Sequence, residues 1–182
     1  MTRIRRSNSP LYALFLAWLF CAGAVTAETE KLSPAGEAFV RDAQQGAKGE
    51  VALGQLAADK AQNSEIRDFG MRLIKDHSKS NKELLEFASR RDITLENDLS
   101  EEHQQLSDKL SKLSGEDFDK EFVSAMIEDH QKDIAKFKTA ADTLSDSFVV
   151  TFARQTLPTL NEHLRIAETL KRQLQPLERQ RQ

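Results

Sequence analysis

Residues 64–90 read SEIRDFGMRLIKDHSKSNKELLEFASR, and their apolar side chains recur every three or four positions. This spacing places them on one face of an α-helix. Ser64 and Glu65 are typical of a helix start. Two polar residues, His77 and Asn81, interrupt the apolar face. The apolar face itself consists of Ile66, Phe69, Gly70, Leu73, Ile74, Leu84, Leu85 and Ala88.

Three further segments carry the same period on either side of this one, over residues 34–61, 116–144 and 147–174. The connector, residues 91–116, contains a shorter helical segment that Ser100 is expected to cap. Runs of β-branched residues are few, and glycine and proline are sparse. The sequence therefore predicts an all-α domain, an up-down-up-down four-helix bundle with a short extra helix between its second and third helices.

The first 27 residues differ in composition from the rest of the chain. Three arginines precede the apolar stretch LYALFLAWLFCAGAV, and Val25-Thr26-Ala27 has the small residues of a cleavage site. These features predict a signal peptide, residues 1–27, that is cleaved after Ala27, and hence a periplasmic or secreted protein. A membrane-spanning helix needs about 20 apolar residues, so a retained anchor is the alternative and no stable span is expected after cleavage.

Cleavage leaves a single domain, residues 28–182, whose helical core spans residues 34–174. Removing the three leader arginines leaves 26 − 3 = 23 basic residues against 29 acidic ones, a balance of −6. The two signs are interspersed, which argues against nucleic-acid binding. Cys21 is the one cysteine and lies in the leader, so the mature domain uses no disulfide. The sequence indicates neither a protein partner nor an oligomeric state.

Four polar residues occupy the midpoints of the four apolar faces: Glu50, His77, His130 and His163. Glu50 and His77 lie about 13 residues from the turn predicted at residues 63–64, and at about 1.5 Å per residue they are level. His130 and His163 likewise lie about 16 residues from the turn predicted at residues 145–147. If the connector holds the two hairpins in register, all four side chains converge at one height.

Three imidazoles and a carboxylate suit a divalent metal ion, with zinc favoured over copper, nickel or ferrous iron. The competing interpretation is a buried polar layer without metal. In that case Glu50 pairs with a protonated histidine and the layer sets helix register. The chain would then be a non-catalytic structural or interaction protein of the bacterial envelope.

The predicted outer partners of these ligands are Asp76, Asn81, Asp129 and Asp133. Asn81 and Asp133 follow a histidine by four and three positions and so share its helix face. Asp76 and Asp129 each precede a histidine by one position, about 100° away around the helix. They are better placed to meet a ring from another helix, or else to face solvent. His103, beside two glutamates, is expected to be solvent-exposed and without a role.

The sequence argues against the redox chemistry of di-iron bundles. That chemistry uses Glu-x-x-His motifs, and the residues three positions before the histidines are Ile74, Ile127 and Leu160. No phosphate-binding loop or nucleophile arrangement stands out either. A non-catalytic role is therefore favoured.

Motifs spread over residues 35–172 form a specific set: Phe39-Val40, Gly49-Glu50-Val51, Leu53-Gly54, Asp76-His77, Asp129-His130 and Thr156-Leu157-Pro158-Thr159-Leu160, followed by His163. They resemble the ferritin-like bacterial family called domain of unknown function 4142. The resemblance implies an exported protein with a ferritin-like helical bundle and no established reaction. The matching positions are Glu50, His77, His130 and His163.

Overall fold

The computed structural model describes residues 31–179, and within this range the chain forms five α-helices and no β-strand. The helices are α1 (Pro34–Lys60), α2 (Ser64–Ser89), α3 (Glu101–Ser111), α4 (Gly115–Thr143) and α5 (Ser147–Arg179). The prediction of an all-α domain is confirmed. The predicted signal peptide and its cleavage site lie outside the described residues.

Side chains at three helix starts satisfy backbone N–H groups that have no partner within the helix. Ser33, Asn63 and Ser100 each accept a hydrogen bond from a backbone N–H in the first turn of α1, α2 and α3, respectively. Such caps are favoured because the first four N–H groups of a helix lack acceptors. The prediction that Ser100 caps the short helix is confirmed.

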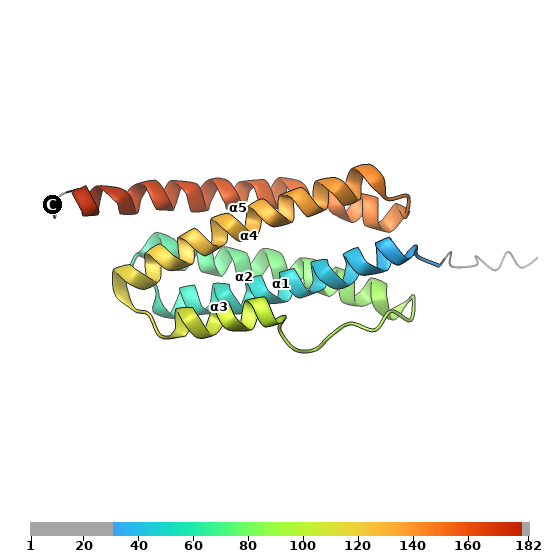
Figure 1. Cartoon of the computed structure of the whole chain (residues 1–182), viewed down its shortest axis with the longest axis horizontal. Helices are drawn as coiled ribbons and strands as arrows, with labels where there is room; N and C mark the ends of the chain where they lie inside the picture. The colour runs from blue at the N-terminus through green and yellow to red at the C-terminus, as the bar shows by residue number, and fades with distance from the viewer. Residues whose placement is uncertain (1–30, 180–182) are drawn as a thin grey trace, which may run out of the picture.

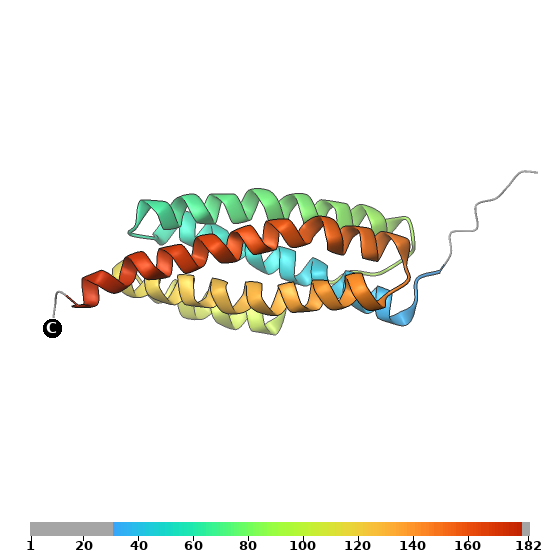
Figure 2. The same ribbon diagram turned by 90° about the horizontal axis from the view of Figure 1, so that it is seen from above.

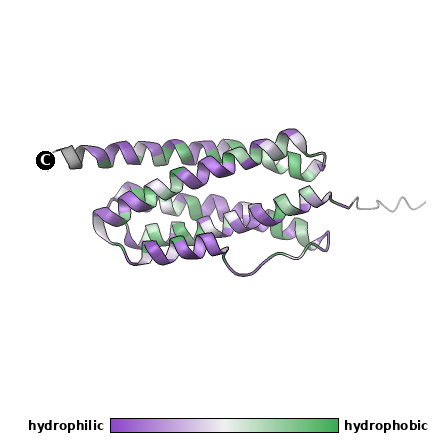
Figure 3. Cartoon of the chain, in the orientation of Figure 1, coloured by the Kyte–Doolittle hydropathy of each residue, from purple (hydrophilic) through white to green (hydrophobic). Residues whose placement is uncertain are grey.

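The long helices pack as two hairpins. Helix α1 packs most closely against α2, and α4 against α5, and a short turn joins the members of each pair. Figures 1 and 2 show the four long helices running along one axis, with α3 on the outside of the molecule near α1. Figure 3 shows hydrophilic and hydrophobic residues interleaved along each long helix, as the amphipathic period requires. None of the described helices is both long and apolar enough to cross a membrane.

Two facing glycines allow α1 and α2 to approach closely. A Cβ atom on Gly54 would lie 2.8 Å from the carbonyl oxygen of Gly70, and one on Gly70 would lie 2.6 Å from that of Gly54. No larger residue fits at either position without moving a helix backbone. The cost of glycine in a helix interior, about 1 kcal/mol, is therefore offset here by backbone contact between helices.

A layer of polar residues divides the apolar core into two clusters. One cluster includes Phe39, Leu84, Phe137 and Phe152, and the other includes Leu53, Phe69, Phe122 and Leu170. Along each long helix, a buried histidine or glutamate separates the members of the two clusters: Glu50, His77, His130 and His163, with buried Gln44 as a second polar residue on α1. The four residues therefore lie at one level of the molecule.

Two aspartates join the hairpins, one at each end. Asp146 in the α4–α5 turn accepts hydrogen bonds from the backbone N–H of Ser33 (3.1 Å) and from its hydroxyl (2.7 Å). At the opposite end, the buried carboxylate of Asp119 accepts hydrogen bonds from the backbone N–H groups of Gln62 (3.0 Å) and Asn63 (2.9 Å). These contacts set the register between the hairpins, and so the level of the polar layer.

Candidate metal centre

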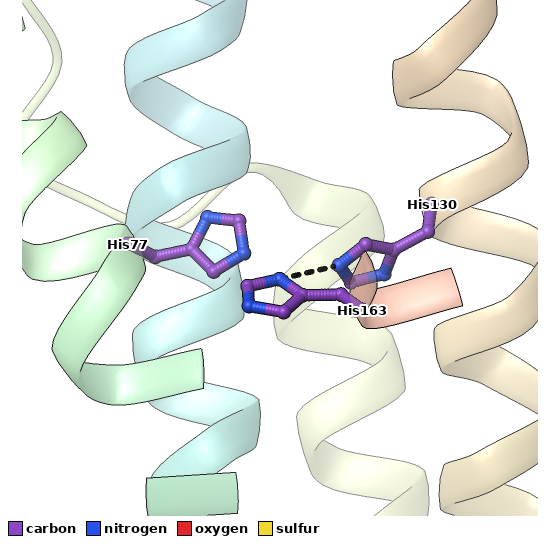
Figure 4. A group of neighbouring side chains, drawn as sticks. All are labelled: His77, His130 and His163. Carbon is purple, nitrogen blue, oxygen red and sulfur yellow. Dashed lines mark hydrogen bonds between the residues drawn. The ribbon is translucent and has the colours of Figure 1, made fainter. Parts of the chain in front are cut away.

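Three histidines from three helices converge inside the molecule. His77 comes from α2, His130 from α4 and His163 from α5, and their rings point toward one another (Figure 4). One ring nitrogen of each lies within 4.8 Å of the others. The residues are 5, 1 and 0 % exposed, respectively. We call these three residues the histidine cluster.

Two hydrogen bonds determine which nitrogens of the histidine cluster carry protons. His130 Nδ1 lies 2.9 Å from the carbonyl oxygen of Met126, which can only accept, so Nδ1 donates. His163 Nε2 lies 3.0 Å from Asp76 Oδ2, and donates to that carboxylate. In neutral rings the remaining nitrogens, His130 Nε2 and His163 Nδ1, are therefore lone-pair acceptors.

These two acceptor nitrogens face each other at 3.3 Å, the contact drawn as a dashed line in Figure 4. A hydrogen bond between them requires an additional proton on one ring. Burial, followed by the charge of His163, lowers the pKa of His130 to about 4, and burial also lowers the pKa of His163. At neutral pH both rings are therefore uncharged, and two lone pairs point at each other.

The third ring adds to the same space a buried nitrogen without a partner in the described part of the chain. Nε2 of His77 is buried and finds no hydrogen-bond partner among residues 31–179. Burial, followed by the neighbouring rings of His130 and His163, lowers the pKa of His77 well below its usual range. A buried polar atom without a partner is costly, so the cluster favours a ligand that accepts electron pairs.

Glu50 lies beside the histidine cluster, on the other edge of the His130 ring. The residue is 1 % exposed, and its Oε1 is 3.6 Å from His130 Nδ1. It is not one of the residues whose ligand atoms lie within 4.8 Å of one another. Burial, then the charge of Asp129 and a hydrogen bond to it, raise the pKa of Glu50 well above its usual range. That hydrogen bond needs a proton between the two carboxyl groups, and without it neither oxygen of Glu50 has a partner.

The four predicted outer partners make different contacts. Asp76 meets the ring of His163, one helix away, rather than that of its sequence neighbour. Asp129 likewise meets a ring from another helix, that of His103. Asn81 accepts a hydrogen bond from Gln44, and Asp133 forms an ion pair with Lys136. Burial, followed by the charge of Asp129, raises the pKa of Asp133 to about 6.

The prediction that His103 is solvent-exposed is wrong. The residue is 8 % exposed, its Nδ1 is 2.7 Å from the Ser100 hydroxyl, and its Nε2 is 3.4 Å from Asp129 Oδ2. Helix α3 folds back onto α1, where Gly49 leaves room for the ring. A Cβ at residue 49 would lie 2.2 Å from His103 Cδ2. The glycine next to Glu50 was the available sequence signal. We call Ser100, His103 and Asp129 the α3 cluster.

The protons of the α3 cluster are matched to its acceptors. The Ser100 hydroxyl can donate to His103 Nδ1, and His103 Nε2–H can donate to the Asp129 carboxylate. Although burial would raise it, hydrogen bonds from His103 and Glu50 lower the pKa of Asp129 to about 2. Each acceptor of the α3 cluster thus has a donor opposite it, without any added ion.

Two solved structures share the fold. A DUF305 fragment from Deinococcus radiodurans is 20% identical with a TM-score of 0.69, and the match covers 78% of this chain and 99% of that one. A putative secreted DUF305 protein from Streptomyces coelicolor is 14% identical with a TM-score of 0.67, and the match covers 77% and 93% of the two chains. At such identities the likeness shows the fold alone. No curated protein matches the sequence.

The family comparison extends over most of the chain. A family model described as domain of unknown function (DUF4142) matches residues 22–170, a range that contains all four central polar residues. The expected resemblance is therefore confirmed, and the chain belongs to the DUF4142 family.

Proposed function

We propose that the protein binds one divalent metal ion, with zinc favoured, through His77, His130 and His163. The cluster provides three neutral nitrogen ligands in a dry core, which suits zinc and the later first-row metals. Asp76 would orient His163 by accepting its Nε2–H, and the Met126 carbonyl would orient His130 in the same way. Both arrangements are of the kind that holds a ligating imidazole in one tautomer.

The observation that carries this proposal is the 3.3 Å separation between two acceptor nitrogens, His130 Nε2 and His163 Nδ1. Zinc–nitrogen bonds of about 2.0–2.1 Å in a tetrahedral site place ligand atoms roughly 3.3–3.4 Å apart. The separation therefore equals one edge of a zinc tetrahedron. A cation between the two lone pairs removes their repulsion and gives His77 Nε2 a partner.

Glu50 is our candidate for the fourth ligand. A divalent cation in a dry core needs nearby negative charge, and Glu50 is the buried carboxyl group next to His130. Its carboxyl group lies at the Nδ1 edge of the His130 ring, so binding the ion would require the side chain to turn toward the histidine cluster. The bound cation would then displace the proton that Glu50 shares with Asp129.

The proposal extends to architecture and location. We infer an up-down-up-down four-helix bundle of ferritin-like type with α3 as the extra helix, forming one mature domain over residues 28–182. We also infer export through a signal peptide cleaved after Ala27, followed by function in the periplasm or outside the cell. The composition of residues 1–27 supports export, and one protein of similar fold is described as putatively secreted. The missing Glu-x-x-His motifs favour metal binding without catalysis.

The alternative is a metal-free polar layer that sets register. It is supported by the 3.6 Å pair between Glu50 and His130 and by the layer's position between two apolar clusters. In this case the protein would be a structural or interaction protein of the envelope. The two functions differ in one observable, the dependence of stability on metal.

The test is the metal content of protein purified from the periplasm without added metal. We expect near-stoichiometric zinc or another first-row divalent ion, by elemental analysis. Zinc at a free concentration 100 times its Kd stabilises the fold by about 2.7 kcal/mol, which raises Tm by roughly 5–10 °C. Metal-free protein whose Tm ignores both zinc and chelator would favour the alternative.

A matched variant separates the two functions further. Glu50→Gln, His77→Leu, His130→Met and His163→Leu together remove the ligands and the buried polar groups. The metal function predicts that this variant loses the zinc-dependent rise in Tm and yet equals or exceeds the apo wild type in stability. The structural function predicts altered register or oligomeric state instead, which chromatography with light scattering would detect.

A further inference from the structure

We propose that the cleft between α3 and α4 is the entrance through which a divalent cation reaches the histidine cluster, and that the contact between His103 and Asp129 closes its inner end. This inference rests on the proposed metal binding. It concerns the route and rate of binding, which the proposed function leaves open. A centre whose ligands are at most 5 % exposed needs such a route.

The cleft has a volume of about 360 Å³ and an acidic lining. Its carboxylates are Glu102, Glu121, Glu128 and Asp129, against two lysines, Lys109 and Lys132. A cleft lined mainly by one sign of charge concentrates ions of the opposite sign and raises their association rate. Carboxylate oxygens also bind a hydrated divalent cation transiently.

Ligand-type groups continue inward from this lining to the histidine cluster. Asp129 lines the cleft through its contact with His103, and it adjoins His130 in the sequence. Glu50 is 1 % exposed, neither of its oxygens has another partner within residues 31–179, and its Oε1 lies 3.6 Å from the ring of His130. Asp129 and Glu50 therefore offer carboxylate oxygens to a cation between the cleft and the histidine cluster.

The inner end is closed by a contact that can open. His103 Nε2 and Asp129 Oδ2 are 3.4 Å apart, longer than most hydrogen bonds of this type. Exposed ion pairs, Lys132–Glu102 and Lys109–Glu121, hold α3 to α4 around the cleft. Exposed pairs are weakened by water and salt. Helix α3 is also the shortest described helix, and Leu110 is its one residue in the buried apolar core. We therefore expect α3 to be displaced more easily than the four long helices.

A second cleft near the histidine cluster is less suited to a cation. It lies between α2 and α5, has a volume of about 330 Å³ and carries two arginines, Arg72 and Arg165, that balance two acids, Glu65 and Asp68. Phe69 also lines it, and the ring of Phe69 packs edge-on against His163 at 6.0 Å. This cleft has no net charge, and its inner wall is an apolar ring.

The test compares zinc association and dissociation rates in matched double variants of the metal-stripped full-length protein, by stopped-flow with a fluorescent zinc chelator. We expect Glu102→Gln with Glu128→Gln to slow association by about tenfold at low ionic strength, with little change in dissociation. The effect should shrink at high salt. The control, Glu65→Gln with Asp68→Asn in the second cleft, should leave both rates unchanged.

Opening the inner contact has a different signature. We expect His103→Ala to raise association and dissociation rates by a similar factor, because a lower barrier speeds both directions while Kd stays nearly constant. His103→Asn provides the same test should the alanine variant not fold. Equal slowing by both acidic pairs, or unchanged rates in the His103 variants, would overturn the entrance while leaving the metal centre intact. Absence of zinc binding by the wild type would instead overturn the proposed function and the entrance with it.

Discussion

The histidine cluster and the α3 cluster each contain buried histidine, yet their protons are arranged in opposite ways. In the α3 cluster each donor faces an acceptor, from the Ser100 hydroxyl through His103 to Asp129. In the histidine cluster the protons point outward, to Met126 and Asp76, and acceptors face acceptors. Burial of a histidine therefore does not by itself indicate metal binding. The direction of the lone pair on its unprotonated nitrogen is the better indicator.

The largest expected effect tests whether only one cluster binds metal. His77→Ala, His130→Ala or His163→Ala should each weaken zinc binding by more than about 100-fold, because a lost ligand costs more than a lost outer partner. The matched control is His103→Ala, a buried histidine of the other cluster, for which we expect a Kd within about threefold of wild type. Isothermal titration against a competing chelator measures both. Equal losses at His103 and His130 would place the metal elsewhere.

Acidification should release zinc from the histidine cluster. Zinc binds neutral imidazole, and burial, followed by the charge of His163, lowers the pKa of His130 to about 4. Protons therefore compete with zinc only in acid, and we expect affinity to hold to about pH 6 and to fall steeply below about pH 5. Equilibrium dialysis over a pH series gives the midpoint. Release centred near pH 6.5 would mean that the rings ionise as exposed histidines do.

The stability of the apo protein should also depend on pH, and the pKa of His130 determines the sign of that dependence. The pKa of His130 is lower in the folded state, about 4, than in the unfolded chain, about 6.5. As pH falls through this window the unfolded chain takes up the proton first, so about 3 kcal/mol of stability present above pH 6.5 is lost. The raised pKa of Asp133 has the opposite effect on stability as pH falls. Asp133 is present in both the wild type and the His130→Gln variant, so a comparison of the two proteins cancels its effect. Urea unfolding of both apo proteins at pH 7.5 and 5 isolates the His130 contribution.

Intermediate effects are expected from the carboxylates that contact each cluster. Asp76→Asn removes the charge that accepts the His163 Nε2–H, and should weaken zinc binding by about 10-fold, within the range typical of outer partners. Asp129→Asn makes the same chemical change beside His103 and should alter equilibrium affinity by less than about threefold. The same chelator competition assay compares them. A larger loss at Asp129 than at Asp76 would reverse the assignment of the two clusters.

The smallest effect on zinc binding is expected at Gly49, which borders the α3 cluster, and Gly46, three residues earlier on α1, is its control. Gly49→Ala places a methyl group 2.2 Å from His103 Cδ2 and should destabilise the fold by about 1–3 kcal/mol, while zinc stoichiometry stays unchanged. Gly46→Ala places its methyl 3.5 Å from Asp133, an ordinary contact, and should stabilise the helix by up to about 1 kcal/mol. Urea unfolding of the apo proteins compares them. Equal effects would show that the His103 ring does not depend on residue 49.

The sequence predicted the level of the polar residues better than the direction of their side chains. The level follows from helix rise and short turns, and His77, His130 and His163 meet as that counting requires. Glu50 reaches the same level, but its carboxyl group is not among the ligand atoms that lie within 4.8 Å of one another, because helical period does not determine a side-chain rotamer.

The contacts that the connector makes with the long helices could not be predicted from helical periodicity. The burial of His103 depends on α3 folding back onto α1, a contact between segments about 50 residues apart, for which no period exists. The choice of Asp76 and Asp129 between a ring and solvent depends on how far each helix rotates about its axis. Only the packed structure determines that rotation.

The origin of the ligands has a mechanical consequence. His77 belongs to the first hairpin, whereas His130 and His163 belong to the second, and each hairpin packs most closely within itself. An ion bound by all three histidines would cross-link the two hairpins, and the chain, with its single cysteine, has no internal disulfide that could do the same. Pulled apart at their far ends, the halves of the loaded protein would resist until a metal–nitrogen bond broke, whereas those of the empty protein would be held by apolar packing and by the hydrogen bonds of Asp146 and Asp119. Bound metal would then show itself most clearly in the lifetime of the fold under load.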